Sequence, residues 1–259
     1  SGQIPINPAT GNIEAEGITA QENFEQYSVP GTTIGTTLWG WSSYNTDANT
    51  PITYETEPGN PANKVARFES KLNRTNTHRT LKYDLPSVLE DGVYSVKFRL
   101  RSGDDDSNTF WLSVLDTQAS KNRHYIAFRL FGNEVAMVSR ADGENDIVSA
   151  EYDFNLTDWF DIEVVYDLTA VDAAYATVYV NETKVLNNVL VGGATSELNN
   201  GTINSIQFQI SNAYNATQIS SSGTAEDGIY ASFLLDDIVI KQTSIVTGVT
   251  AAEGNLSTI

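Results

Sequence analysis

The chain has 259 residues, a formal net charge of −18, 40% hydrophobic residues and no cysteine. This length fits one large all-β domain or two small domains, and the hydrophobic content supplies a sizeable core. The absence of cysteine excludes disulfides and thiolate metal sites, the charge argues against nucleic acid as a partner, and no apolar run approaches the roughly 20 residues of a membrane helix. We expect a secreted protein, because the composition is rich in Asn, Thr, Ser and Gly and poor in lysine, and we expect it to be a monomer.

The positive charge is concentrated in one part of the chain. Thirteen of the 15 Lys and Arg residues, and both histidines, lie between residues 64 and 140, where nine acids leave a net charge of +4. The rest of the chain carries a net charge of −22. A basic patch on an acidic protein suits an anionic ligand, although scattered surface ion pairs are an alternative explanation.

Strand patterns begin after a short arm. Residues 1–15 are expected to form an N-terminal arm, residues 16–243 a single domain, and residues 244–259 a C-terminal tail or linker. Polar and apolar residues alternate with a period of two between turn-forming segments, which favours antiparallel strands. The segments that show this pattern are 63–72, 92–102, 108–116, 123–131, 134–140, 159–167, 174–181, 203–211 and 231–241. We therefore predict an all-β, two-sheet antiparallel jelly roll, a concanavalin-like sandwich with a concave groove.

The two ends of the domain carry acidic segments. ENFEQY (22–27) and LLDDIVI (234–240) resemble the terminal strands of many carbohydrate-binding jelly rolls, where acidic side chains from both ends bind a structural calcium ion. The resemblance implies calcium ligands among Glu22, Glu25, Asp236 and Asp237, and carboxylate oxygen is the donor that calcium prefers. Solvated carboxylates at the edge of a sheet are the alternative.

Two tryptophans follow the first acidic segment, in LWGWSSYN (38–45). Trp39 and Trp41 could stack on sugar rings, as aromatic side chains of carbohydrate-binding modules do. Tryptophan pairs are more often part of a hydrophobic core, and that interpretation stays open beside the first.

Alternation also separates the two faces of each predicted strand. In 92–102, Arg99 and Arg101 lie opposite the apolar residues. The other polar faces carry Arg67 and Lys71 in 63–72, Tyr125 and Arg129 in 123–131, and Gln207 and Gln209 in 203–211. If these strands adjoin in one sheet, their polar faces form one charged groove, with the loop residues Arg74 and His78 beside it.

The segment GNEVAMVSR, residues 132–140, contains the single methionine of the chain. Ala136 and Val138 share one face of this strand, so alternation places Met137 on the other face. We expect that other face to be the polar one, which puts Met137 at the groove. A native methionine at the groove edge, or a core position, is the alternative.

A groove of this kind suits an acidic polysaccharide. β-Elimination of a polyuronate requires a cation or amide that neutralises the uronate carboxylate, a base that removes the C5 proton, and an acid that protonates the leaving oxygen at C4. Arginine with glutamine or asparagine serves the first role, and histidine, lysine or tyrosine serves the others. The reaction needs no metal or other cofactor.

Two segments resemble the jelly-roll polysaccharide lyases. RFESK (67–71) is similar to the R-x-E-x-R strand of alginate lyases with this architecture, with Lys71 in place of the last arginine. QFQISNAYNA (207–216) resembles their late strand Y-F-K-A-G-x-Y-x-Q, with Tyr214 at the tyrosine position and Ala216 in place of the final glutamine. Their Q-I-H strand is not matched. The order of segments and the chain length resemble more closely the ulvan lyases of polysaccharide lyase family 28, which cleave a sulfated rhamnose–uronate polymer.

The resemblance implies an endo-acting ulvan lyase whose partner is a sulfated, uronate-containing polysaccharide. A lysine at position 137 would be well placed as the base, so we hypothesise that Met137 stands in place of a natural lysine. His124 is the other candidate base, and Tyr214 or Tyr125 is the candidate acid. The candidate substrate-binding residues are Arg67, Lys71, Arg74, Arg99, Arg101, Arg129, Gln207, Gln209 and Asn215.

Other functional classes remain as rivals. A non-catalytic carbohydrate-binding module of the same fold predicts that Trp39 and Trp41 are exposed and coplanar, and that no product forms. Sandwich-fold glucanases carry the pattern E-x-D-x-x-E, which supplies two catalytic carboxylates on one strand face, and the sequence lacks it. An adhesin or structural domain is the last alternative.

Overall fold

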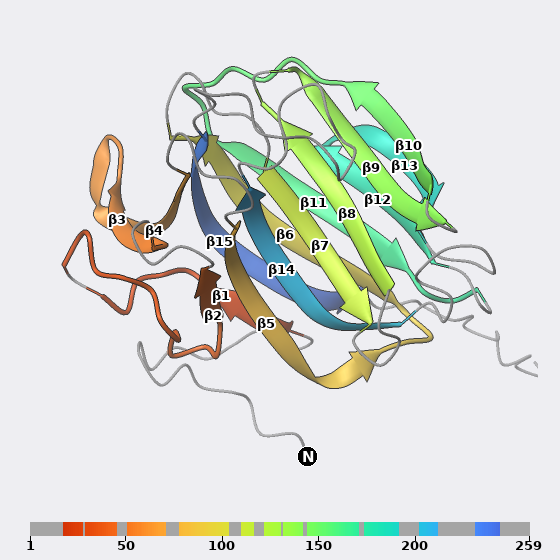
Figure 1. The fold of residues 1–259 in the computed structure, drawn as a ribbon, viewed down its shortest axis with the longest axis horizontal. Helices are drawn as coiled ribbons and strands as arrows, with labels where there is room; N and C mark the ends of the chain where they lie inside the picture. The colour runs from red at the N-terminus through yellow and green to blue at the C-terminus, as the bar shows by residue number, and fades with distance from the viewer. Residues whose placement is uncertain are drawn as a thin grey trace, which may run out of the picture.

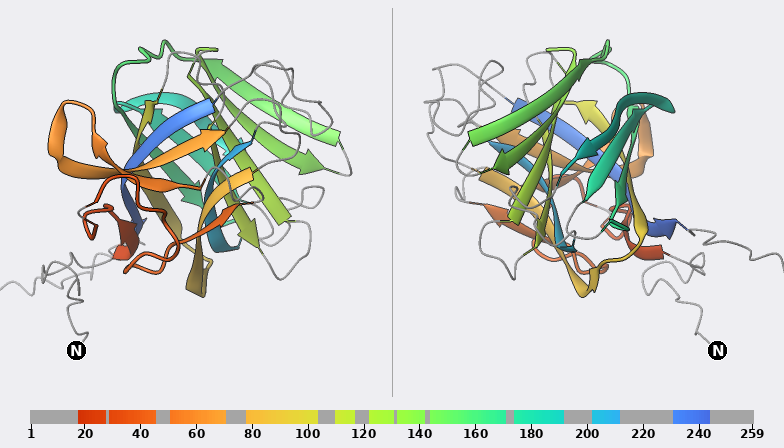
Figure 2. Two further views of the ribbon diagram at one scale, coloured as in Figure 1. Left: turned by 60° about the vertical axis from the view of Figure 1, so that its left-hand side comes forward. Right: turned by 90° about the vertical axis from the view of Figure 1, so that its right-hand side faces the viewer.

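The computed structural model describes residues 18–27, 29–45, 51–70, 78–103, 110–116, 122–130, 132–141, 144–170, 174–191, 202–211 and 231–243 (Figure 1). These residues form two antiparallel β-sheets packed face to face, and Figure 2 shows the two layers from the sides. Among the described residues, no helix is long and apolar enough to cross a membrane. The predicted all-β jelly-roll sandwich is therefore confirmed.

One sheet has eight strands. Its order is β13 (Thr183–Leu190), β12 (Tyr175–Val180), β11 (Phe160–Asp167), β6 (Val93–Ser102), β15 (Ala231–Thr243), β4 (Asn60–Ser70) and β3 (Thr53–Glu57), and β1 (Ile18–Glu22) also pairs with β15. The pairing of β1 with β15 brings the two ends of the described chain together in one sheet.

The second sheet has seven strands. Its order is β10 (Glu144–Glu151), β9 (Glu134–Ala141), β8 (Asn122–Arg129), β7 (Phe110–Asp116), β14 (Ile203–Ser211), β5 (His78–Leu89) and β2 (Ser42–Asn45). In Figure 1, strands β14, β7 and β8 of this sheet lie in front of β6 and β11 of the other. Three strands that alternation did not single out, β2, β5 and β10, belong here.

The core lies between the sheets and is rich in aromatic rings. Phe208 of β14 occupies its centre, with its ring centroid 4.9 Å from that of Phe98 on the opposite sheet, 5.9 Å from Trp41 and 6.0 Å from Phe110. All four rings are buried. Aromatic pairs at these separations stabilise a core beyond the burial of their area. Because one face of each sheet packs against the other sheet, each sheet has one remaining outer face.

The edge of the seven-stranded sheet is less well covered. Strand β10 is the last strand of that sheet, and Ile147 and Val148 on it are 45% and 46% exposed. Successive residues of a strand point to opposite faces. Both faces of this edge strand therefore show apolar side chains to solvent.

Strand β15 contains a β-bulge next to Asp236. Its register against β6 shifts between Asp236 and Val239, and Asp237 adopts a positive φ of 49°. A β-bulge of this kind places two successive side chains on one side of the strand and re-aims them. Asp236 and Asp237 are thereby both directed to the outer face of the eight-stranded sheet, where both contact Arg99.

Candidate functional site

The outer face of the seven-stranded sheet carries a continuous row of polar positions. The backbone register aligns Ser42, Lys82, Gln207, Ser113 and Tyr125 across strands β2, β5, β14, β7 and β8. The adjacent row contains Thr80, Gln209, Trp111 and Ala127. With strands spaced about 4.8 Å apart, the first row spans about 19 Å. We call these two rows the polar face.

Lys82 of β5 supplies an ammonium group to the first row of the polar face, next to the central Gln207. Its ammonium group lies 2.9 Å from the carboxylate of Asp84, and its side chain is 37% exposed. Gln207, directly across the register on β14, is half-buried. An ammonium group beside an amide is a combination that holds carboxylate or sulfate groups.

Several outward positions of the polar face are nevertheless buried. Trp111 is 5% exposed, Ser113 1% and Thr80 6%, although all three point away from the core. Hydrogen bonds and charges act more strongly where water is excluded, because the effective dielectric constant falls. Thr80, Trp111 and Ser113 are thus shielded from solvent, whereas Lys82 and Gln207 are partly exposed and accessible to a ligand.

Arg129 lies on the same outer face, as predicted, but its charge is already paired. Its guanidinium forms an ion pair with Glu134, which stands directly opposite on β9. The guanidinium also packs close to Gly132, because a Cβ built at that glycine would lie 3.5 Å from its nitrogens. Arg129 is therefore tied into the turn between β8 and β9.

The prediction that Met137 faces the groove is wrong. Met137 pairs with Ile126 and Val148 in the register, is 1% exposed and belongs to the hydrophobic core. Alternation grouped it correctly with Val135, but that pair faces the opposite sheet. A lysine here would bury an ammonium group in an apolar environment, which is costly. The hypothesis of a replaced catalytic lysine at this position therefore loses its structural basis.

The expectation of one charged groove is also wrong, because the predicted arginines lie on two opposite faces of the molecule. Arg67 is on β4 and Arg99 and Arg101 are on β6, all in the eight-stranded sheet. Arg67 and Arg101 flank Leu234 on the outer face of that sheet, and Arg67 pairs with Glu69 at 3.3 Å. These arginines cannot contact the same sugar as Lys82 and Gln207.

Arg99 instead holds a cluster of carboxylates on the outer face of the eight-stranded sheet. Its guanidinium nitrogens lie 3.2 Å from Glu57 Oε1, 3.4 Å from Asp237 Oδ2, 3.6 Å from Asp236 Oδ2 and 4.0 Å from Asp161 Oδ1, and the guanidinium stacks 4.5 Å from the ring of Trp159. Asn63 donates from Nδ2 to Asp236 Oδ2 at 2.7 Å. Arg99 thus joins β3, β11 and β15 through its side chain.

Asp236 is the buried member of this cluster. Its side chain is fully buried, and burial, reinforced by the negative charge of Asp237, raises the pKa of Asp236 to about 7. The hydrogen bond from Asn63 and the charge of Arg99 act in the opposite direction. The cluster therefore contains a carboxyl group that changes its protonation state near neutral pH.

The four predicted calcium ligands do not form one donor set. Glu22 lies on the inner side of β1 and is 1% exposed, and burial raises the pKa of its carboxyl. Glu25 Oε1 accepts the backbone N–H of Lys64 at 2.8 Å. Asp236 and Asp237 face outward and bind Arg99. Among the described residues, no group of three His, Cys, Asp or Glu side chains is arranged to hold a metal ion.

The remaining predicted residues are only partly within the described chain. Lys71, Arg74, Tyr214 and Asn215 lie outside the described residues. Positions His124 and Tyr125 are described by their backbone: the register aligns His124 with the buried Val114, and Tyr125 with Ser113 on the polar face. The backbone thus favours position 125 over position 124 as part of the polar face.

Both tryptophans pack in or against the hydrophobic core. Trp41 is fully buried, and its indole N–H donates to the carbonyl of Gln21 at 3.0 Å. Trp39 is half-buried and packs against the core. The pair is therefore not the exposed, coplanar platform that a binding module would require.

Sequence reasoning missed Lys82, Thr80, Trp111 and Ser113. The signal for Lys82 was present in KYDL (82–85), where Lys82 and Asp84 alternate with Tyr83 and Leu85. Arg79 obscured the pattern, because it occupies an inward position opposite Ile210 and is fully buried. A charged residue on the inward face of a strand interrupts the alternation of polar and apolar residues by which the strand is recognised.

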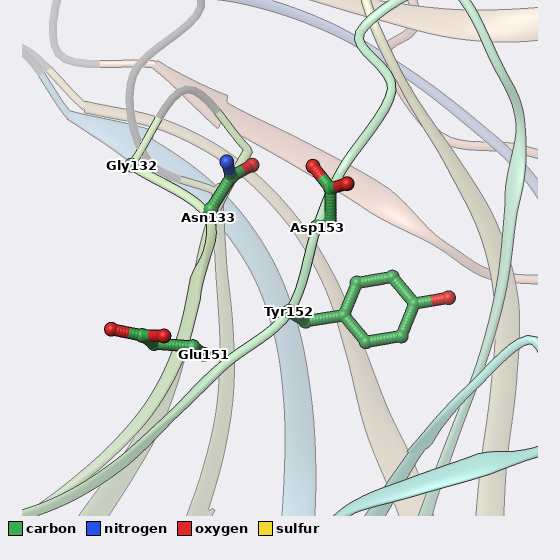
Figure 3. A pocket seen from close by; sticks show the side chains of 5 residues that line it. All are labelled: Gly132, Asn133, Glu151, Tyr152 and Asp153. Carbon is green, nitrogen blue, oxygen red and sulfur yellow. The ribbon is translucent and has the colours of Figure 1, made fainter.

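An open pocket lies at the β10 side of the same sheet. Its volume is ≈ 350 Å³ and it is lined by Gly132, Asn133, Glu151, Tyr152 and Asp153 (Figure 3). We call it the turn pocket. Asn133 has a positive φ of 50° and fixes the facing segment, because its carbonyl accepts the Tyr152 N–H at 2.9 Å and its Oδ1 accepts the Phe154 N–H at 3.0 Å.

Comparison with known proteins supports the architecture. No protein-family model and no curated protein matches the sequence. A solved structure of an alginate lyase Aly36B variant with an alginate tetrasaccharide is similar, with a TM-score of 0.53 and 12% identity over 88% of this chain and 98% of that one. Endo-β-1,4-glucuronan lyase from the fungus Trichoderma reesei gives a TM-score of 0.50 and 11% identity over 83% and 96% of the two chains.

A third structure of the same fold is the cellulose-induced protein Cip1. Its TM-score is 0.52, with 13% identity over 80% of this chain and 94% of that one. At these identities the likeness concerns the fold and not the chemistry. The chain therefore has a β-sandwich fold that polysaccharide lyases share.

Proposed function

We propose that this chain is a polysaccharide lyase that cleaves a uronate-containing polysaccharide by β-elimination, with ulvan as the expected substrate. The observation that supports it best is the row in which Lys82, Gln207, Ser113 and position Tyr125 stand side by side. The row provides an exposed ammonium group, a half-buried amide and a phenol position along one line. Two solved structures with this fold are a glucuronan lyase and an alginate lyase, which act on polyuronates by name.

In the proposed mechanism, Lys82 and Gln207 bind the uronate carboxylate. Neutralising that carboxylate stabilises the negative charge that develops when the C5 proton leaves. Lys82 suits this role because its ion pair with Asp84 is solvent-exposed, so a uronate carboxylate can compete with Asp84 for the ammonium group. The electrons of the C5–H bond form the C4–C5 double bond, the C4–O bond breaks, and the leaving oxygen takes up a proton.

The proton transfers are assigned to tyrosine. The backbone register aligns position 125 with Ser113, and Tyr214 is the residue that the lyase resemblance suggests. A tyrosine removes the C5 proton when neighbouring cations favour its ionised form, and its protonated form donates to the leaving oxygen. Calcium has no step in this scheme.

The test is formation of an unsaturated uronate, followed by its ultraviolet absorbance, when the chain is mixed with ulvan, alginate or glucuronan. The wild type is expected to form product, and Lys82→Met is expected to lower kcat/KM by about 100-fold. Lys241→Met is the matched control, because Lys241 lies on the outer face of the other sheet. It should leave the rate unchanged.

Three outcomes would contradict the proposal or part of it. Absence of product from every polyuronate would refute the lyase, and binding without product would favour the non-catalytic carbohydrate-binding module. Full activity of Lys82→Met would refute the assignment of the carboxylate-binding site. Full activity of Tyr125→Phe would transfer the proton-transfer role to Tyr214.

A further inference from the structure

Lys82 and Asp84 form an exposed pair of opposite charges within the candidate site. They occupy alternate positions of β5 and point to the same outer face of the seven-stranded sheet, where β5 lies beside β14 (Figure 1). The ammonium nitrogen of Lys82 lies 2.9 Å from Asp84 Oδ2, and the two side chains are 37% and 63% exposed. Asp84 thus occupies the group to which the proposed function assigns the uronate carboxylate.

The ion pair between Lys82 and Asp84 is weak enough for a ligand to open. Both charges become hydrated when an exposed pair separates, so such a pair favours its closed state by no more than about fivefold. A ligand that binds only the open state has its affinity reduced by about the same factor. Asp84 therefore competes with a uronate carboxylate for Lys82, and the ligand can displace it.

Ser205 stands directly across from Asp84 on β14. The register pairs Ser205 with Asp84 and Gln207 with Lys82, so the two pairs follow each other on the outer face. Opposite residues of an antiparallel pair have Cβ atoms about 5 Å apart, which a carboxylate and a hydroxyl can bridge. Ser205 is fully buried, and its hydroxyl has no hydrogen-bond partner among the described residues. A carboxylate that turns toward this hydroxyl gains a hydrogen bond that the free protein lacks.

Asp84 also has room to change partners. In the described part of the chain, β2 pairs with β5 from Arg79 to Lys82, so Asp84 lies beyond the end of that pairing. Its side chain is the more exposed member of the ion pair. Rotation about the Cα–Cβ bond redirects the carboxylate from Lys82, along the strand, to Ser205, across it.

We propose that Asp84 is an exchangeable carboxylate that sets the affinity of the site for uronate: it binds Lys82 in the free protein and turns to Ser205 when a uronate carboxylate takes its place. The inference rests on the proposed function, since it uses Lys82 as the group that binds the uronate. A neutral sugar has no charge with which to displace Asp84. Asp84 is therefore a specificity-determining residue that favours sugars with an acid group over neutral sugars.

The test is calorimetric titration with a glucuronate trisaccharide, in a background that carries Tyr125→Phe and Tyr214→Phe so that cleavage does not consume the ligand. Asp84→Asn is expected to lower Kd about threefold to fivefold, because the competing carboxylate is removed. Glu163→Gln is the matched control, since Glu163 forms an exposed pair with Lys97 at 3.4 Å on the outer face of the other sheet. It removes the same charge and should change Kd by less than about twofold. Equal Kd values for the two variants overturn the proposal.

Ser205→Ala tests the second position of the carboxylate. It is expected to raise Kd about threefold when Asp84 is present and to leave Kd unchanged in the Asp84→Asn variant, where no carboxylate has to be displaced. Equal effects in both backgrounds overturn the transfer to Ser205. The urea-unfolding midpoint of Ser205→Ala should stay unchanged, because its hydroxyl bonds to none of the described residues in the free protein. A lowered midpoint would give Ser205 a structural role instead and would contradict the proposal.

Failure of the exchange and failure of the lyase function give different results, because the test measures binding. If no polymer yields product but the Kd values shift as stated, the exchange holds and the lyase function fails. If product forms but Asp84→Asn binds no more tightly than Glu163→Gln, the exchange fails and the lyase function stands. Absence of trisaccharide binding to every form overturns the exchange.

Discussion

Replacement of Asp236 by asparagine is expected to change the pH dependence of stability. The pKa of Asp236 is raised from 3.8 to about 7 by burial and by Asp237. Between these two values the folded protein binds a proton that the unfolded chain releases. Stability from this group is therefore greatest at low pH and is lost as the pH rises toward 7. The amide side chain of the Asp236→Asn variant is neutral at every pH, so the substitution removes this dependence.

The size of the effect follows from the same two pKa values. One pKa unit corresponds to about 1.36 kcal/mol, and the folded carboxyl stays protonated over about two units between pH 5 and pH 7. The wild type should therefore lose about 2–3 kcal/mol of stability from Asp236 between pH 5 and pH 8. Repulsion within a chain of net charge −18 adds a loss that the variant shares.

The assay is urea unfolding followed by tryptophan fluorescence at several pH values from 5 to 8. The difference in stability between wild type and Asp236→Asn should change by about 2–3 kcal/mol across this range. Asp161→Asn is the control, since Asp161 also faces Arg99 but its side chain is 79% exposed. Parallel curves for wild type and Asp236→Asn would refute the assignment of a raised pKa to this carboxyl.

Three further substitutions test the packing. Met137→Lys should destabilise the fold by at least about 3 kcal/mol in urea unfolding, whereas a groove position would make it nearly neutral. Phe208→Ala should cost about 3–5 kcal/mol, because its ring contacts three other rings, and a loss below about 1 kcal/mol would contradict the central position of that ring. Arg99→Ala should lower the free energy of unfolding by about 3–5 kcal/mol at pH 8, where Asp236 is ionised, and by less at pH 5, where Asp236 is protonated. An equal loss at both pH values would argue against coupling between Arg99 and Asp236.

The sequence predicts which residues share a face more reliably than which face is buried. In strand β9 both alternating sets are apolar, with Val135 and Met137 on one side and Ala136 on the other. Which face of β9 is buried is determined by the neighbouring strand β8, where Phe128 pairs with Val135 and Ile126 pairs with Met137. That pairing is a long-range contact, so alternation within one short segment does not contain it.

The assignment of strands to sheets is beyond local patterns for the same reason. Alternation correctly predicted that Phe98 and Arg99 point to opposite faces of their strand. It did not predict that this strand, β6, lies between β11 and β15 and not beside β14. Each sheet of a sandwich has its own polar outer face, so two polar faces look alike in sequence. The bulge that turns Asp236 and Asp237 to the same side also breaks the period of two on which such reasoning depends.

Strand β10 has a consequence for how the protein behaves in concentrated solution. Its position at the end of the sheet leaves one set of backbone N–H and C=O groups unpaired with any described strand, and Ile147 and Val148 beside them are exposed. Such an edge is a template on which a strand of another molecule can add. The net charge of −18 keeps molecules apart at neutral pH, so acidification toward the low isoelectric point should cause aggregation that begins at this edge.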